Sequence, residues 1–396
     1  MPVGARVLLD DFLADRDAPS RLGHREPFIG KRVGDLADVD PVELERSIVV
    51  VEPWAHVGLR PTDHRGVVAS ENVAYLADQI MGVQTLIVPA WRDGVGDPGR
   101  FAAIVSRAML VVFEGGEPDV HVSSSFAEAY PRIAATRTLV ELLLRGVPFM
   151  GICLSHQLVA QAHVELIKDA VERLGASGHR TFVDVAQRIS EVGRSLRVEK
   201  DYGVVATSWD DETFAVAKNE QVSHAHTRLY PYADVDLVHV PTMVSEAHRY
   251  IARKYEATID SALQYEDELR IQAFHGNEVS QESARFVCWA YQELHRVLSA
   301  YRLDAASRPD IQPLMGAPLA VEILASTHRE DGRVLCEVAA TGTYWERGVT
   351  AMTTQFHPEL DESLHTASEG WAPDWFEMKQ SDGFRLLARM MRACIR

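Results

Sequence analysis

Two segments far apart in the sequence carry the side chains that nucleophilic catalysis needs. Cys153 lies between a short apolar run and an amphipathic segment, with the small residues Gly151 and Ser155 on either side. Small neighbours permit a tight turn between a strand and a helix, and such a turn holds the side chain clear of the sheet. The start of the following helix stabilises a thiolate. The pattern predicts that Cys153 is a nucleophile, and His357 and Glu359 are candidates for its partners.

The histidine and the carboxylate follow the last apolar run of the chain. His357 lies 204 residues after Cys153, and Glu359 comes two residues later. A histidine base that a carboxylate orients is the group that activates a cysteine nucleophile. Upstream, Glu114-Gly115-Gly116 ends another apolar run, and the backbone N–H groups of such a segment can face a developing oxyanion.

The apolar pattern predicts the elements that must position these residues. Short apolar runs at 48–51, 85–88, 109–113 and 147–151 alternate with helical spacing at 73–80 and 133–144. Alternating short apolar runs and amphipathic helices are typical of parallel strands joined by helical crossovers. Three further strands are predicted at 319–325, 334–338 and 352–356. We therefore expect a mostly parallel α/β sheet.

The same pattern predicts how the chain is divided. Residues 1–46 are mixed and charged, and we interpret them as an N-terminal extension to a domain spanning 47–396. Helical insertions are expected at about 161–270 and 280–316, with helices across 246–265 and 281–301. Because both insertions leave the sheet beside the candidate site, they are predicted to gather at its mouth. They would serve there as a docking surface for a partner or as plain cover.

Composition excludes several classes of protein. The chain has 396 residues, of which 46% are hydrophobic and 24% charged, so it can bury a large core. A net charge of −17 argues against binding to nucleic acid or to anionic membranes. Four scattered cysteines, with no CxxC pair, predict neither a disulfide framework nor a structural zinc site. Early acidic residues and the absence of a long apolar segment favour a cytoplasmic location.

Three motifs in order resemble the class I (triad-type) glutamine amidotransferases. GICLSHQ at 151–157 is similar to the family's GICLGHQ turn, and QFHPE at 355–359 matches its histidine–glutamate motif. Between them, HGNEV at 275–279 is similar to an HGxxV segment of the family. The resemblance covers roughly 47–160 and 270–360. It implies a flavodoxin-like three-layer sandwich with helical insertions.

The resemblance also implies catalytic roles. Cys153 would attack the side-chain amide of L-glutamine and form a γ-glutamyl thioester. His357 would move the proton, and Glu359 would orient His357. The backbone N–H groups of Gly116 and Leu154 would form the oxyanion hole.

Glutamine itself would be held by three further residues, namely Gln157, Gly276 and Asn277. The chain departs from the family where Glu117-Pro118 follows the glycine pair, and where Ser155 replaces a glycine. Pro118 has no N–H to offer a substrate. The resemblance implies no cofactor and no metal. No ATP-binding motif is visible in the sequence, so an acceptor or synthetase protein is expected as a partner.

Alternatives stay open at this level. The same triad would serve a hydrolase of γ-glutamyl amides or peptides that needs no partner, and a relative without catalysis would keep the fold as a binding module. His224 and His226 have the spacing of two metal ligands on a strand, but the sequence offers no third ligand. The segment from Phe214 to His224 is a second candidate for the middle family motif.

Overall fold

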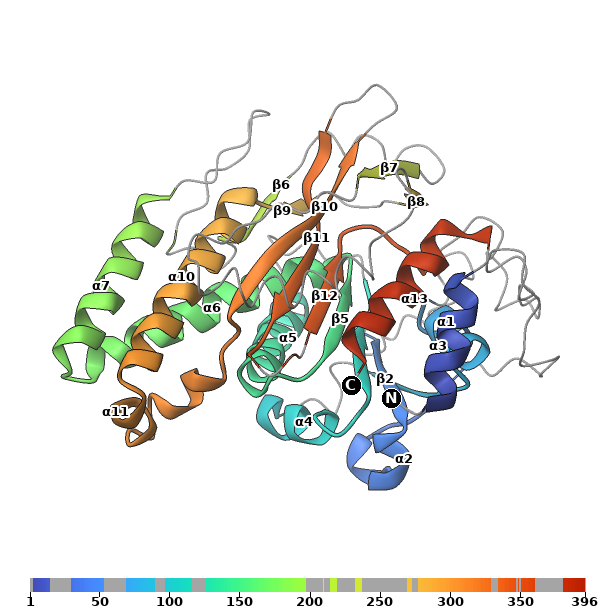
Figure 1. Cartoon of the computed structure of the whole chain (residues 1–396), viewed down its shortest axis with the longest axis horizontal. Coiled ribbons are helices and arrows are strands. Elements are labelled where there is room, and N and C mark those ends of the chain that lie inside the picture. Colours follow the sequence, from blue (N-terminus) through green and yellow to red (C-terminus); the bar gives the residue numbers. More distant parts are fainter. Residues whose placement is uncertain are drawn as a thin grey trace.

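The computed structural model describes most of the elements expected from the sequence. It describes residues 3–14, 30–52, 69–89, 97–115, 126–196, 209, 214–218, 232–236, 269–272, 277–328, 334–346, 348, 350–359 and 380–395. In this part of the chain ten strands form one twisted sheet (Figure 1), in the order β1-β3-β2-β4-β5-β12-β11-β10-β7-β8. A short second sheet pairs β6 (Val216–Lys218) with β9 (Asn277–Val279).

The large sheet is parallel on one side and antiparallel on the other. Every neighbouring pair from β1 to β12 is parallel, and every pair from β12 to β8 is antiparallel. In sheet order the strands are β1 (Lys31–Arg32), β3 (Gln84–Pro89), β2 (Ser47–Glu52), β4 (Leu110–Phe113), β5 (Phe149–Ile152), β12 (Thr350–Thr354), β11 (Val334–Tyr344), β10 (Ala320–His328), β7 (Tyr232–Asp236) and β8 (Leu269–Gln272). The prediction of a mostly parallel sheet is confirmed.

The central strands are buried on both faces, which explains their continuous apolar runs. All six residues of β2 are buried. Val49 and Val51 pack into one hydrophobic core, whereas Ile48 and Val50 pack into another. Because successive side chains of a strand point to opposite faces, the two cores lie on opposite sides of the sheet. The three-layer arrangement expected from the sequence is therefore confirmed.

Two groups of helices cover the two faces. On one face lie α1 (Val3–Ala14), α3 (Ala69–Met81) and α13 (Asp382–Cys394), which contact one another. The other face is covered by α4 (Pro98–Val105), α5 (Phe126–Arg145), α6 (Leu154–Ala176), α7 (Arg180–Ser195) and α10 (Gln281–Ala300). Figure 1 shows α7, α10 and α11 (Arg302–Ala306) extending away from the sheet at one end of the molecule.

The N-terminal and inserted segments contribute to the same structure. The short strand β1 pairs with β3, and α1 packs against α3 and α13. Two short elements, η1 (Leu36–Asp38) and α2 (Pro41–Glu45), connect β1 to β2. Within the second insertion, α10, α11 and η4 (Gln312–Gly316) are helical as expected. The division into an extension and a domain with insertions stays a prediction.

The expectation that residues 161–270 are helical is correct for α6 and α7 and wrong further along. Here β6, β7 and β8 are strands, and β7 and β8 extend the large sheet beyond β10. Leu269-Arg-Ile-Gln272 alternates apolar and polar residues, but over four residues such alternation is too short to stand out. The helix expected across 246–265 lies outside the described residues. None of the described helices has the length and apolar character needed to cross a bilayer.

Candidate active site

Cys153 forms the junction between β5 and α6. Its φ of 51° makes it the only residue other than glycine with a positive φ in the described part of the chain. A side chain in this conformation is strained, and the surrounding structure must hold it in place. The Cys153 N–H donates to the Thr354 carbonyl at 2.7 Å, and its carbonyl accepts from the N–H of His156 at 3.0 Å. The predicted sharp strand-to-helix turn is therefore present.

His357 and Glu359 follow β12, the strand that pairs with β5. The His357 Nδ1 and Glu359 Oε1 atoms are 2.7 Å apart, and the Glu359 side chain is buried. Asn72 at the start of α3 donates its side-chain amide to the Glu359 backbone carbonyl at 3.1 Å. The ring of His357 forms a further hydrogen bond with the side chain of Cys153. The structure thus brings the three residues of the predicted triad together.

Gly115, two residues after β4, lies next to the side chains of Cys153 and His357. A Cβ atom at this position would lie 2.9 Å from the Cys153 Cβ and 3.0 Å from the His357 Cε1. Both distances are at or below the shortest that real Cβ contacts allow, so only glycine leaves both side chains undisturbed. The backbone of the Glu114-Gly115 segment therefore lies directly against the nucleophile and the base. The neighbouring Gly116, predicted for the oxyanion hole, lies outside the described residues.

Charges around His357 favour its protonated form. Burial lowers the pKa of His357, but the neighbouring Glu359 carboxylate and the Cys153 side chain raise it, and the net result is a pKa well above the usual range. A protonated histidine beside a cysteine sulfur stabilises the thiolate. A ring that favours protonation therefore lies beside the sulfur of Cys153.

A second carboxyl group lies in this environment. Burial raises the pKa of Glu114 well above its usual range, and the Glu52 and Glu359 carboxylates raise it further. Arg32 and His357 act in the opposite direction. Glu114 Oε1 is buried without a hydrogen-bond partner in the described part of the chain. The surroundings of Glu114 therefore favour its neutral form, and Glu359 is the carboxyl group that contacts His357.

The side chain of Glu52, the last residue of β2, has hydrogen-bond donors of its own. Its carboxylate accepts from Arg32 Nη1 at 2.7 Å and from the Ser70 hydroxyl at the start of α3. Arg32 also binds Glu71 at 3.0 Å. Both Glu52 carboxylate oxygens therefore have a hydrogen-bond donor. Sequence reasoning assigns no role to Glu52 or to the Glu114 side chain, although both directly follow predicted buried strands.

The side chain of Gln157 is buried and contacts another side chain, so it does not face an open substrate site in this structure. It lies one turn into α6, and its side-chain Nε2 donates to Gln355 Oε1 at 3.1 Å. Gln355 in turn points its Nε2 at the Cys153 Sγ, 3.7 Å away. Gln355 is part of the QFHPE motif, but sequence reasoning assigns it no role of its own.

The structure describes only some of the other residues that the sequence predicts for the site. Leu154 is the first residue of α6, where a backbone N–H has no intrahelical acceptor and is available to an oxyanion. Asn277 begins β9, which contacts α6 and β11. Gly276, His224 and His226 lie outside the described residues. Among the residues that the structure describes, no group of three or more histidine, cysteine or acidic side chains could hold a metal ion.

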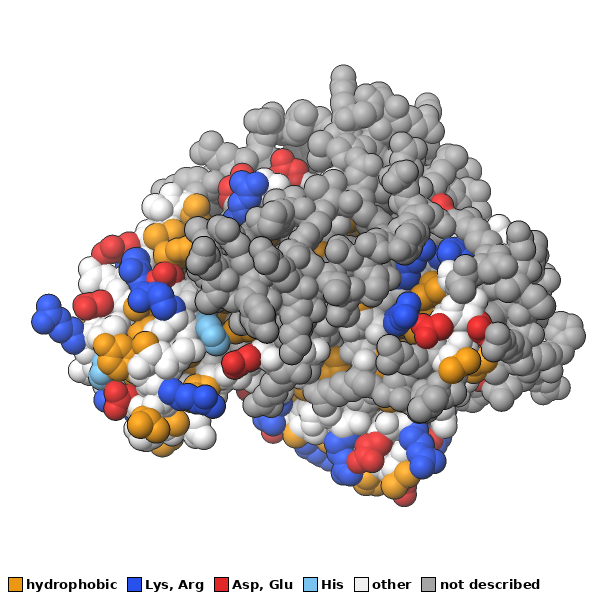
Figure 2. Space-filling view, viewed as in Figure 1, with side chains coloured by type: hydrophobic (Ala, Val, Ile, Leu, Met, Phe, Trp, Pro, Cys, Tyr) orange, Lys and Arg blue, Asp and Glu red, His pale blue; other side chains and the backbone are white. Residues whose placement is uncertain are grey.

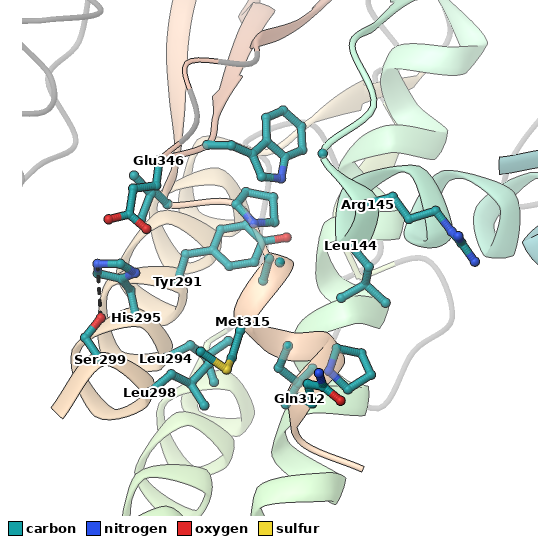
Figure 3. Close-up of a pocket in the computed structure, with 18 of the residues that line it drawn as sticks. Leu144, Arg145, Tyr291, Leu294, His295, Leu298, Ser299, Gln312, Met315 and Glu346 are labelled. Carbon is teal, nitrogen blue, oxygen red and sulfur yellow. Dashed lines mark hydrogen bonds between the residues drawn. The ribbon is translucent and has the colours of Figure 1, made fainter. Parts of the chain in front are cut away.

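A cavity of about 880 Å³ lies at the other end of the strands (Figure 3), next to Gly146, which precedes β5, and Trp345, which follows β11. Tyr291 and His295 of α10 line it, together with Glu346. Burial lowers the pKa of His295, and Glu346 partly offsets this. Because Cys153 follows the carboxyl end of β5, this cavity is separate from the candidate active site.

Comparisons with known proteins agree with the motifs. A family model described as "Glutamine amidotransferase class-I" matches residues 116–293, which include the Cys153 turn. No curated protein matches the chain.

The chain is similar to several solved structures. One is the glutaminase domain of Trypanosoma brucei CTPS with bound acivicin. The two share 10% identity and a TM-score of 0.40, and the match covers 87% of this chain and 94% of that chain. A glutamine amidotransferase from Thermotoga maritima has 12% identity and a TM-score of 0.37, covering 87% of this chain and 98% of that chain. The family match confirms, over residues 116–293, the resemblance to class I glutamine amidotransferases first seen in the motifs.

Proposed function

We propose that the protein releases ammonia from L-glutamine through a γ-glutamyl thioester on Cys153. The observation that carries the proposal is the joint placement of three side chains at one edge of the sheet. His357 lies between the thiol of Cys153 and the buried carboxylate of Glu359. A nucleophile, a base and a group that orients the base are the parts that acyl transfer from an amide requires.

In the first step the Cys153 sulfur attacks the side-chain carbonyl carbon of glutamine. His357 holds the thiol proton, and the new carbon–sulfur bond places a negative charge on the carbonyl oxygen. The N–H groups of Leu154 and Gly116 are the donors proposed to stabilise this oxyanion. Glu359 keeps the ring of His357 in position and stabilises its positive charge.

In the second step the tetrahedral intermediate collapses. His357 delivers its proton to the amide nitrogen, the carbon–nitrogen bond breaks, and ammonia leaves. The γ-glutamyl group then remains bound to Cys153 as a thioester. Water, with His357 as base, hydrolyses the thioester, so that glutamate leaves and the thiol is restored.

The ammonia acceptor belongs to a partner in this proposal. The sequence has no recognisable ATP-binding motif, so an acceptor or synthetase protein would supply the second half of an amidotransferase reaction. Glutamine binding would use Gly276, Asn277 and the region around Gln157.

The proposal is tested by measuring glutamate and ammonia formed from glutamine by the full chain. We expect Cys153→Ala to abolish both products, and Cys288→Ala, at a buried cysteine of α10, to retain them. A folded wild-type protein that hydrolyses γ-glutamyl peptides and refuses glutamine would establish the rival hydrolase. Equal glutaminase activity in wild type and Cys153→Ala would overturn the proposed nucleophile.

A further inference from the structure

A pair of buried amide side chains connects α6 to the Cys153 sulfur. Gln355 Nε2 lies 3.7 Å from Cys153 Sγ, within the range of hydrogen bonds to sulfur. Gln157 Nε2 lies 3.1 Å from Gln355 Oε1. Both glutamine side chains are buried.

In the structure the nitrogen end of the Gln355 amide faces the sulfur. Gln157 offers an N–H to the Gln355 oxygen, and this leaves the Gln355 nitrogen directed at Cys153. The backbone beneath the pair is held on both sides. The Gln355 N–H donates to Ala339 of β11 at 2.7 Å, and the Cys153 N–H donates to Thr354 at 2.7 Å. The backbone positions from which the two side chains meet are therefore fixed.

A hydrogen bond from Gln355 matters most when the sulfur is charged. Hydrogen bonds to ionised groups are about twice as strong as those between neutral groups, and burial strengthens them. His357 supplies one stabilising contact to the sulfur from the β12 side. Gln355 supplies a second contact, with no proton of its own to transfer.

We propose that Gln355 is a catalytic residue that stabilises the Cys153 thiolate, and that Gln157 is a positioning residue that orients Gln355. This inference rests on the proposed function for its biological meaning, but its chemistry concerns the sulfur alone. It gives Gln157 a different task from the substrate contact implied by the family resemblance.

The test uses iodoacetamide, a small electrophile without the amino-acid part of glutamine. The rate of alkylation at Cys153 is followed by peptide mass spectrometry in the full chain near neutral pH. We expect Gln355→Met to slow this rate about tenfold, because a hydrogen bond to the thiolate is lost. Gln157→Met is expected to slow it about threefold, since Gln355 keeps its donor but loses its orientation.

The chain offers a matched control. Gln292 Nε2 lies 3.6 Å from the Sγ of Cys288 within α10, which is the same kind of contact at a cysteine outside the triad. Gln292→Met should leave Cys153 alkylation unchanged. Thermal unfolding of each variant identifies those that keep the fold, and Gln157→Met, altered on a different element, gives a second test if Gln355→Met does not fold.

Two results would overturn the inference. One is a folded Gln355→Met variant that alkylates at the wild-type rate. The other is a Gln157→Met variant that raises the KM for glutamine and leaves alkylation unchanged, which would make Gln157 a substrate contact. A wild-type protein without glutaminase activity that still shows the predicted alkylation pattern would refute the proposed function and support the inference.

Discussion

At the scale of single residues, the triad depends on contacts from segments that lie far from it in the sequence. Cys153 and His357 belong to short motifs with a recognisable chemistry. Asn72, which donates to the backbone of Glu359, lies 287 positions away from it and belongs to no motif. Contacts of this kind depend on how distant strands end at one sheet edge, and no local pattern records them.

The unequal roles of His357 and Glu359 predict unequal losses of activity. His357→Ala removes the group that moves the proton, and we expect glutaminase kcat/KM to fall by about 10⁴-fold or more. Glu359→Gln keeps the shape and loses the negative charge that stabilises the imidazolium, so we expect a loss about tenfold smaller. Steady-state kinetics of both variants provide the measurement. Wild-type activity in His357→Ala would exclude the triad.

Glu114 predicts a pH-dependent change in stability. Its pKa is raised in the folded protein, so folding takes up a proton once the unfolded chain would have lost it. The free energy of unfolding therefore falls as pH rises from the ordinary glutamate pKa toward the raised one. Because a glutamine side chain carries no charge at any pH, Glu114→Gln should stabilise the protein more at about pH 8 than at about pH 5.

Urea unfolding at the two pH values measures this difference. Glu45→Gln serves as a control, because Glu45 lies half exposed on α2 in an ion pair with Arg107. We expect no comparable pH dependence for that variant. A Glu114→Gln protein that is less stable than wild type by the same amount at both pH values would contradict a raised pKa of Glu114.

At the scale of elements, α6 combines the nucleophile with two buried histidines. His156 contacts Thr353 Oγ1 at 2.7 Å and the Val338 carbonyl at 2.9 Å, which connects α6 to β12 and β11. His163 contacts the Tyr291 hydroxyl at 2.7 Å and so connects α6 to α10. These histidines hold the helix in place, and neither faces the reacting groups described above.

The two histidines predict loss of stability in acid. Burial lowers the pKa of His156 to about 4 and that of His163 to about 3. Between these values and the ordinary histidine pKa the unfolded chain binds protons that the folded protein refuses, so stability falls as pH falls. His156→Gln and His163→Gln should each reduce the drop in Tm between about pH 7 and about pH 5. If both variants show the same drop in Tm as the wild type, groups other than these two histidines cause the acid sensitivity.

The elements also show where sequence patterns fail. Continuous apolar runs predict β2, β3, β4 and β5, because burial on both faces leaves no polar alternation. The edge strands β7 and β8 have short, mixed sequences, and their pairing with each other and with β10 defines them. Pairing between strands distant in the sequence produces no clear local pattern of apolar residues. The sequence pattern alone therefore predicts an insertion that is wholly helical.

At the scale of the whole molecule, the charged side chains on the face seen in Figure 2 carry both signs. Figure 2 shows positive and negative side chains intermixed where the surface is described. On α7 and α10, Arg188 and Arg296 both pair with Glu293. A partner that meets this surface would find charges of both signs there.

The connection between β7 and β8 offers a test of the insertion hypothesis. The two strands are antiparallel neighbours, and Val235 lies opposite Leu269, so a short hairpin turn can replace residues 237–268. We expect this variant to fold and to keep basal glutaminase activity, while binding to an acceptor protein is lost. Activity and thermal unfolding measure the first expectation, and co-purification measures the second. Normal partner binding would make the segment plain cover.

The central claim, that Cys153 carries the γ-glutamyl group, is tested most directly by trapping the intermediate. The full chain is mixed with isotopically labelled glutamine, quenched in acid during turnover and digested for peptide mass spectrometry. The account predicts labelled γ-glutamyl mass on the peptide containing Cys153, and none in the Cys153→Ala variant. Label on the Cys288 or Cys394 peptide, or turnover of glutamine with no label on Cys153 at any quench time, would contradict it.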